Sequence, residues 1–180
     1  MTRKYNPLQT VPMNIDTVEA INNLILECPY GILIGGISCV GKSHFNMFLD
    51  KQKGFIGNGA CKYPSAKEPH RIQKLGVAEL TKAKNVNEYY EICKWKGIRG
   101  IILVGTSYKT WQQQAIIRES HNPVCRNRTS GRKSTIEHYT NYYSNTTKKL
   151  QEYNLPHLLI DNRDGCTILN REDFLTMIRS

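Results

Sequence analysis

The sequence lacks any apolar run close to the roughly 20 residues that a helix needs to cross a bilayer, so a membrane-spanning protein is not expected. No long apolar stretch follows the basic residues 1–4, and a secretory signal is not expected either. The cysteines never form a CxxC pair, which argues against a zinc site, and a chain of this length needs no disulfide scaffold. We expect reduced thiols, as in a cytosolic protein, at all six positions: Cys28, Cys39, Cys61, Cys93, Cys125 and Cys166.

Acidic residues are also scarce. The chain of 180 residues has 15 Asp and Glu against 25 Lys and Arg, which gives a formal net charge of +10. An excess of this size favours polyanionic partners, and here that means a nucleotide or a nucleic acid. The length suits one α/β domain and is too short for two comfortable ones.

Short apolar runs alternate with segments of helical spacing, and the chain has no internal repeat. The runs predict buried strands at 31–34, 98–104 and 157–160, with a further short strand at 55–56. Helical spacing predicts helices that begin at Asp16 or Thr17 and at 44–50, 108–118, 134–153 and 170–179, with helix or mixed structure at 71–84. This alternation predicts an α/β fold of three layers, a parallel sheet with helices on both faces. The polar residues 1–14 are expected to form a flexible arm.

One segment matches the phosphate-binding pattern GxxxxGK[ST] in full: Gly36, Ile37, Ser38, Cys39, Val40, Gly41, Lys42 and Ser43. A strand is expected just before it and an amphipathic helix just after it, which is the context that this motif requires. The glycines allow a tight loop whose N–H groups face phosphate oxygens, and the helix adds its positive dipole end. Lys42 is expected to contact the β- and γ-phosphates and Ser43 to bind Mg²⁺, with His44 next to them in the ATP site.

Three features together resemble the small P-loop kinases, the group of polynucleotide kinases, zeta toxins and nucleoside-monophosphate kinases. The motif lies near the N-terminus, an arginine-rich stretch follows a late strand and helix, and a long helix then leads to a last strand and a short closing helix. The resemblance implies a kinase domain over 15–180 that uses ATP and Mg²⁺, with a basic lid at about 119–133. Guanidinium groups in the lid would stabilise the charge of the transferring group beside Lys42. The candidates are Arg126 and Arg128, then Arg118 and Arg132.

The acids that such kinases use are not where the resemblance would put them. No acidic residue occurs between Asp50 and Glu68, where an Asp usually activates the acceptor hydroxyl, and the apolar run 101–104 is followed by Gly-Thr-Ser. Residues 158–161 do have the form of an apolar run plus an acid. Asp161 could therefore be the Mg²⁺ partner of Ser43 if the sheet order differs from that of the kinases. Asn162, in the turn that follows, resembles a residue that borders the adenine.

A basic segment at 62–71 lies where kinases of this group bind the acceptor. Lysine and arginine side chains there could follow a phosphate backbone, and a tyrosine could stack on a base. Glu68 and His70 are also candidates for the general base. The expected acceptor-binding residues are Lys62, Tyr63, Lys67, Glu68, His70 and Arg71.

The expected function is transfer of the γ-phosphoryl group to a hydroxyl on a nucleic acid, either a 5′ end or a hydroxymethylated base of DNA. The net positive charge favours this acceptor. Such an acceptor resembles the substrates of the polynucleotide kinases and of the phage hydroxymethyluracil DNA kinases. This resemblance implies a cytoplasmic protein, either cellular or phage-encoded. A free nucleoside monophosphate stays open as the acceptor, since a basic segment with Arg71 would bind its phosphate too. A P-loop NTPase without an acceptor is the other alternative.

The tyrosines at 139, 142 and 143 are interpreted as packing residues rather than base platforms.

Overall fold

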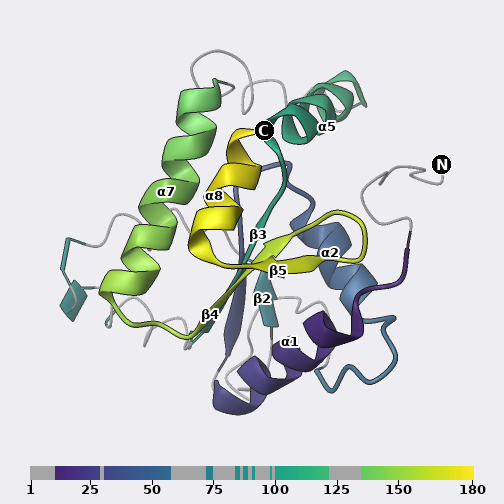
Figure 1. Ribbon diagram of the computed structural model, residues 1–180, viewed down its shortest axis with the longest axis vertical. Helices are drawn as coiled ribbons and strands as arrows, with labels where there is room; N and C mark the ends of the chain where they lie inside the picture. The colour runs from purple at the N-terminus through teal and green to yellow at the C-terminus, as the bar shows by residue number, and fades with distance from the viewer. Residues whose placement is uncertain are drawn as a thin grey trace.

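The structure is a computed structural model that describes residues 11–28, 31–57, 72–74, 84–85, 87–88, 91, 98, 100–121 and 135–180. Within these residues the fold is α/β, and most of its sheet is parallel (Figure 1). No helix in the described ranges is both long and apolar enough to cross a membrane.

Five described strands form one sheet in the order β2-β1-β3-β4-β5. Their bounds are Ile72–Lys74 for β2, Ile32–Gly35 for β1, Gly100–Gly105 for β3, His157–Asp161 for β4 and Thr167–Leu169 for β5. The strands from β2 to β4 pair in parallel, and β1 and β3 are buried along their whole length, as their continuous apolar runs predict.

The parallel prediction is wrong for β5, which pairs with β4 in the antiparallel sense. A tight turn joins the two strands, with positive φ at Asp164, Gly165 and Cys166. A connection this short can only return the chain beside itself, because a parallel neighbour needs a long crossover. The sheet is therefore mixed. Residues 55–56 form no strand, and 72–74, expected within helical or mixed structure, form β2 instead.

The predicted helices are present with boundaries shifted by a few residues. They are α1 at Ile15–Glu27, α2 at Lys42–Leu49, α5 at Tyr108–His121, α7 at Ile136–Glu152 and α8 at Arg171–Arg179. Asn170 caps the last helix, since its side chain accepts a hydrogen bond from the Asp173 N–H. The first helix is instead preceded by Asn14, one position before its first residue.

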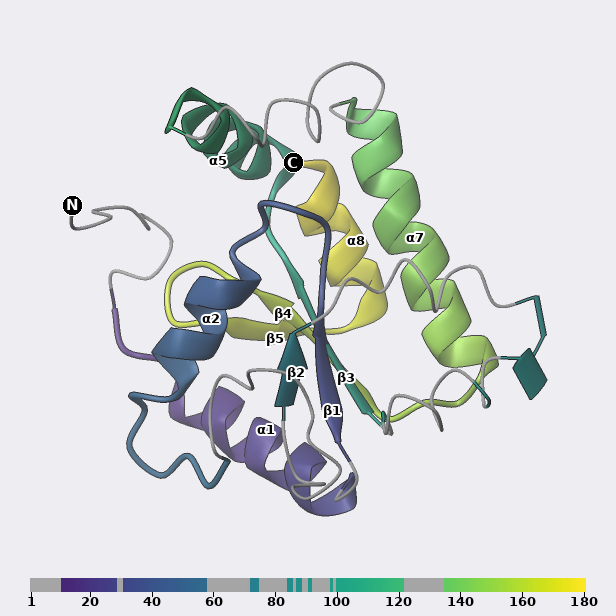
Figure 2. The same cartoon turned by 180° about the vertical axis from the view of Figure 1, so that it is seen from behind.

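Helices lie on both sides of the sheet (Figures 1 and 2). Two glycines of β3 show this, because positions 100 and 105 of a strand point to opposite faces. A Cβ on Gly100 would meet the Cys28 side chain at the end of α1, and a Cβ on Gly105 would meet Phe174 and Ile178 of α8. The core fills the space between, and α7 packs against α8 on that second side.

The last residues of the expected N-terminal arm pack on the domain. Met13 is buried, and its N–H donates to the Gln52 side chain at 3.1 Å. The Asn14 N–H donates to the Gly165 carbonyl at 2.8 Å. Residues 13 and 14 are thus fixed at the turn after α2 and at the turn before β5, while residues 1–10 lie outside the described part of the chain.

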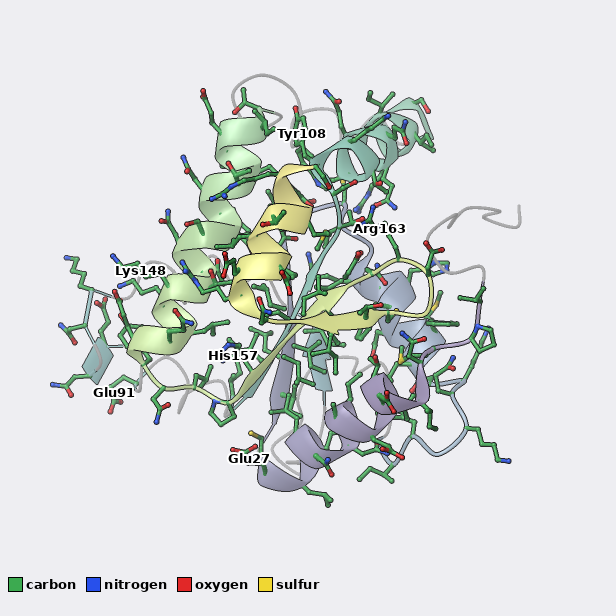
Figure 3. The ribbon with its side chains drawn as sticks, in the orientation of Figure 1. Glu27, Glu91, Tyr108, Lys148, His157 and Arg163 are labelled. Atoms are coloured by element: carbon green, nitrogen blue, oxygen red, sulfur yellow. The ribbon has the colours of Figure 1, made fainter. Side chains whose placement is uncertain are left out.

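The carboxyl ends of β1, β3 and β4 meet at one edge of the sheet, as their parallel register requires. The residues that follow them, 36–41, 106–107 and 162, therefore lie close together. Figure 3 shows Tyr108 and Arg163 at this end of the molecule, with Glu27 and His157 at the other end. In α/β sheets this edge is where ligands bind.

Candidate functional site

The 36–43 loop runs from the end of β1 into the first turn of α2 (Figure 2). Its backbone is left-handed at two places, Cys39 with φ of 68° and Gly41 with φ of 93°. Left-handed residues in a turn point successive N–H groups into one concave surface, which is a common way to bind anions. The strand–loop–helix order that the motif requires is present.

Gly36 allows the loop to leave the sheet. It has φ of 152°, and a Cβ here would lie 2.6 Å from the Val104 carbonyl oxygen and 2.8 Å from a Val40 methyl group. The closer neighbour cannot retreat, since it is backbone of β3. Glycine at this position is thus a steric requirement of the fold.

Three elements hold the loop from outside. The indole N–H of Trp111, in α5, donates to the Ser38 carbonyl at 2.8 Å. The hydroxyl of Tyr143, in α7, accepts from the Ile37 N–H at 3.3 Å and donates to the Val104 carbonyl at 2.8 Å. The side-chain amide of Asn162, after β4, donates to the Val40 carbonyl at 3.2 Å.

These bonds fix the direction of the loop's N–H groups. In a planar trans peptide the carbonyl and the N–H point in opposite directions. Because the Ser38 carbonyl faces Trp111, the Cys39 N–H points away from α5. Because the Val40 carbonyl faces Asn162, the Gly41 N–H points away from that residue. Within the described residues neither N–H donates to a protein acceptor, so both are available to an anion.

The Lys42 side chain folds back over the loop. Its Nζ donates to the carbonyls of Gly36 at 2.7 Å and Ile37 at 3.0 Å. The Gly36 carbonyl and the Ile37 N–H belong to one peptide, so the amine lies on the side of the loop opposite to Tyr143. A cation held there by carbonyl oxygens can turn to phosphate oxygens when they arrive, since a charged acceptor makes the stronger bond.

Ser43 and His44 follow in the first turn of α2, where Ser43 is exposed and His44 half-buried. Partial burial, together with the nearby charge of Lys51, lowers the pKa of His44. The imidazole is therefore held neutral near the loop and adds no charge to it at neutral pH.

Arg118 is the one expected lid arginine within the described residues. It extends from α5, and its Nη1 lies 3.6 Å from the Cys39 Sγ. A guanidinium group is thus beside the middle of the loop, together with the Lys42 amine. The other lid candidates and all the expected acceptor-binding residues lie outside the described residues: Arg126, Arg128, Arg132, Lys62, Tyr63, Lys67, Glu68, His70 and Arg71.

Asn162 is fully buried, and its backbone N–H also donates to the Gly105 carbonyl at 2.8 Å. Its side chain is engaged by the loop and by the Cys166 thiol, 3.7 Å away. Sequence reasoning expected it beside the adenine, and the structure gives it a different contact, with the backbone of the phosphate-binding motif.

Asp161 ends β4, and both of its carboxylate oxygens accept hydrogen bonds from Arg163, at 2.9 to 3.2 Å. This pairing raises the pKa of Arg163. The strand β3 separates β4 from β1, the strand that leads to Ser43. The Arg163 guanidinium therefore competes with a metal ion for the Asp161 carboxylate. Among the described residues, no group of three or more His, Cys, Asp or Glu side chains could hold a metal ion.

Thr106 follows β3 at the same edge and is fully buried. Its carbonyl accepts from the Tyr139 hydroxyl at 2.6 Å, but its Oγ1 has no hydrogen-bond partner in the described structure. A buried hydroxyl without a partner is uncommon and calls for a water molecule or another polar group beside it. It is an uncommitted polar atom at the carboxyl edge.

Tyr139 and Tyr143 are fully buried, which confirms their interpretation as packing residues. Tyr139 stacks on Trp111 with ring centroids 4.7 Å apart and meets Tyr143 edge-on at 5.1 Å. Burial raises the pKa of both phenols, so they remain neutral. Sequence reasoning missed the contacts of Trp111 and Tyr143 with the loop. Their helical spacing indicates burial, but nothing local shows which carbonyl or N–H they reach.

No protein-family model matches the chain, and no curated protein matches it.

Proposed function

We propose that this chain is a P-loop kinase of three-layer α/β architecture that binds ATP and Mg²⁺ at the 36–43 loop and transfers the γ-phosphoryl group to a hydroxyl on a nucleic acid. The observation that carries the proposal is the loop at the carboxyl edge of the sheet. Its Ser38 and Val40 carbonyls are held outward, two of its N–H groups have no acceptor among the described residues, and the Lys42 amine lies over it.

The residues divide the work on the triphosphate. The Cys39 and Gly41 N–H groups and the start of α2 would receive the β-phosphate, because they offer partial positive charge without a competing acceptor. Lys42 would turn from the loop carbonyls to the β- and γ-phosphates, and the Ser43 hydroxyl would bind Mg²⁺. Arg118 would add a second cation at the γ-phosphate, where charge develops during transfer.

The nucleic-acid acceptor rests on the net charge of +10. A chain that meets only a small nucleotide needs a few local cations, whereas a phosphate backbone attracts a basic surface as a whole.

The test is transfer from γ-labelled ATP with Mg²⁺ to three acceptors: a 5′-hydroxyl oligonucleotide, a duplex with a hydroxymethylated base, and mixed nucleoside monophosphates. We expect label on one of the first two. Label on monophosphates alone would replace the nucleic-acid acceptor with a free nucleotide, and label released only as phosphate would make the chain an NTPase.

Lys42→Ala removes the amine from the loop, and we expect transfer to fall to background. The matched control is Lys148→Ala, since the Lys148 side chain is 70% exposed and pairs with Glu152 on the surface of α7. The control should keep wild-type transfer. Comparable loss in both variants would show that the effect is not specific to the loop.

A further inference from the structure

We infer that Tyr143 and Trp111 are positioning residues for the phosphate-binding loop, and that they set its affinity for phosphate by fixing the direction of its N–H groups. The inference rests on the proposed function, because it assigns a role at the same site. Both side chains come from helices distant in sequence from the motif, and neither is expected to touch phosphate.

The first reason is the placement of the two bonds. Trp111 holds the carbonyl side of the peptide between Ser38 and Cys39, and Tyr143 holds the N–H side of the peptide between Gly36 and Ile37. Peptide planarity then turns the Cys39 N–H away from α5 and the Gly36 carbonyl toward the Lys42 amine. Two side chains thus orient one donor and the site of the cation.

The second reason is that the holding groups are themselves rigid. Trp111 and Tyr143 are 1% and 0% exposed, and both contact the Tyr139 ring. Tyr143 also meets Phe174 edge-on and donates to the Val104 carbonyl of β3. The loop is therefore tied to the core of the sheet rather than to mobile surface groups. A preorganised donor loses less free energy on binding than one that must first be ordered.

A matched pair of variants separates positioning from packing. Tyr139 and Tyr143 lie one turn apart in α7, both are fully buried, and both donate to a carbonyl of β3 or the residue after it. Only Tyr143 also accepts from the loop. Tyr143→Phe and Tyr139→Phe each remove one buried hydroxyl and leave one carbonyl without its donor. Only Tyr143→Phe also removes a hydrogen bond to the loop.

The first measurement needs no nucleotide. Amide hydrogen exchange of the peptide that covers 36–43 should be about three- to tenfold faster in Tyr143→Phe than in wild type, because one hydrogen bond that holds the loop is lost. In Tyr139→Phe it should stay at the wild-type rate. Equal rates in both variants would overturn the inference, whatever the protein binds.

The second measurement uses tripolyphosphate and ATP as probes, by titration calorimetry with Mg²⁺. Tyr143→Phe and Trp111→Phe should each weaken the binding of both probes by about three- to tenfold. Within each variant the factor should be the same for tripolyphosphate and ATP, because the change lies in the phosphate site. Tyr139→Phe should bind both as wild type does. If all three variants lost affinity for the probes in proportion to the decrease in their melting temperatures, the role of these residues would be structural only.

Phe174→Leu is the control for Trp111→Phe. It disturbs the same aromatic cluster through the Tyr143 ring contact, at 5.6 Å, without removing a hydrogen bond to the loop. It should lower the melting temperature and reduce phosphate affinity less than Trp111→Phe does; a loss of affinity as large as that of Trp111→Phe would count against the inference. If wild type binds neither probe, the proposed function is wrong, and the exchange rates still decide the positioning role.

Discussion

Two turns at the carboxyl edge of the sheet differ in how their polar groups are satisfied. The 36–43 loop is held by side chains from α5, α7 and the residue after β4, and in the described part of the chain two of its N–H groups have no protein acceptor. The 161–166 turn closes on itself. Arg163 pairs with Asp161, and the Cys166 N–H donates to the Arg163 carbonyl at 2.8 Å.

Two further carbonyls of the second turn are also engaged. The Gly165 carbonyl accepts from the Asn14 N–H, and the Cys166 carbonyl accepts from the Thr17 hydroxyl at 2.6 Å. Both turns contain left-handed residues, so backbone shape alone does not distinguish them. The difference is whether neighbouring elements leave donors available, and within the described residues only the first turn keeps such donors.

The largest effect is expected from alanine at a glycine of each turn. Gly36→Ala forces a Cβ against the Val104 carbonyl oxygen at 2.6 Å, and we expect a loss of about 2–4 kcal/mol in unfolding free energy together with loss of ATP binding. Gly165→Ala meets the Asn14 Oδ1 at 2.7 Å, the end of a side chain that can move. Its cost should be about 1–2 kcal/mol with ATP binding kept. Urea unfolding and calorimetry measure both, and equal loss of ATP binding would erase the contrast.

Asn162→Ala removes the side chain by which the second turn holds the first. The Val40 carbonyl, buried without its donor, should cost about 1–3 kcal/mol, and ATP affinity should fall as the Gly41 N–H loses its fixed direction. The matched control is Asn170→Ala, which removes the cap of α8 and should cost about 1 kcal/mol. Unchanged ATP affinity in Asn162→Ala would mean that the two turns are independent.

Arg163→Ala opens the self-contained turn. The pair with Asp161 is partly exposed, so the loss of stability should be below about 1 kcal/mol. If Asp161 is the Mg²⁺ partner of Ser43, the released carboxylate should lower the Mg²⁺ concentration needed for half-maximal transfer. Arg171→Ala serves as control, since its guanidinium donates to the Thr147 hydroxyl instead of a carboxylate. An unchanged Mg²⁺ dependence would remove Asp161 as a ligand.

The smallest effect concerns pH. In the folded state the pKa of His44 is lowered, mainly by burial and further by the charge of Lys51. At pH values between the folded pKa and the ordinary histidine pKa near 6.5, the unfolded chain therefore binds more protons than the folded one. Stability should therefore decrease as pH falls below about 6.5. His44→Gln should flatten this part of the profile, measured as melting temperature from pH 7.5 to 5.5. The 161–166 turn has no histidine, so a slope that persists in His44→Gln would have to come from elsewhere.

The strand–loop–helix shape of residues 32–49 and the main helices could be predicted because their causes are local. Glycine spacing sets the loop, apolar runs set β1 and β3, and Asn170 caps α8 through a neighbour three residues away. The contacts that shape the loop could not be predicted, because Trp111 and Asn162 lie 73 and 122 residues along the chain from the residues whose carbonyls they hold. No pattern of local spacing carries that information.

The sequence by itself determined that a glycine-rich turn with Lys42 and Ser43 would join a buried strand to a helix, since these depend on backbone freedom and apolar periodicity. Only the tertiary structure decided that β5 returns antiparallel, that Asn162 is buried against the loop, and that Asp161 is paired with Arg163. The physical reason is that the direction of an N–H or the pairing of a carboxylate depends on which distant groups the folded sheet brings within hydrogen-bond reach.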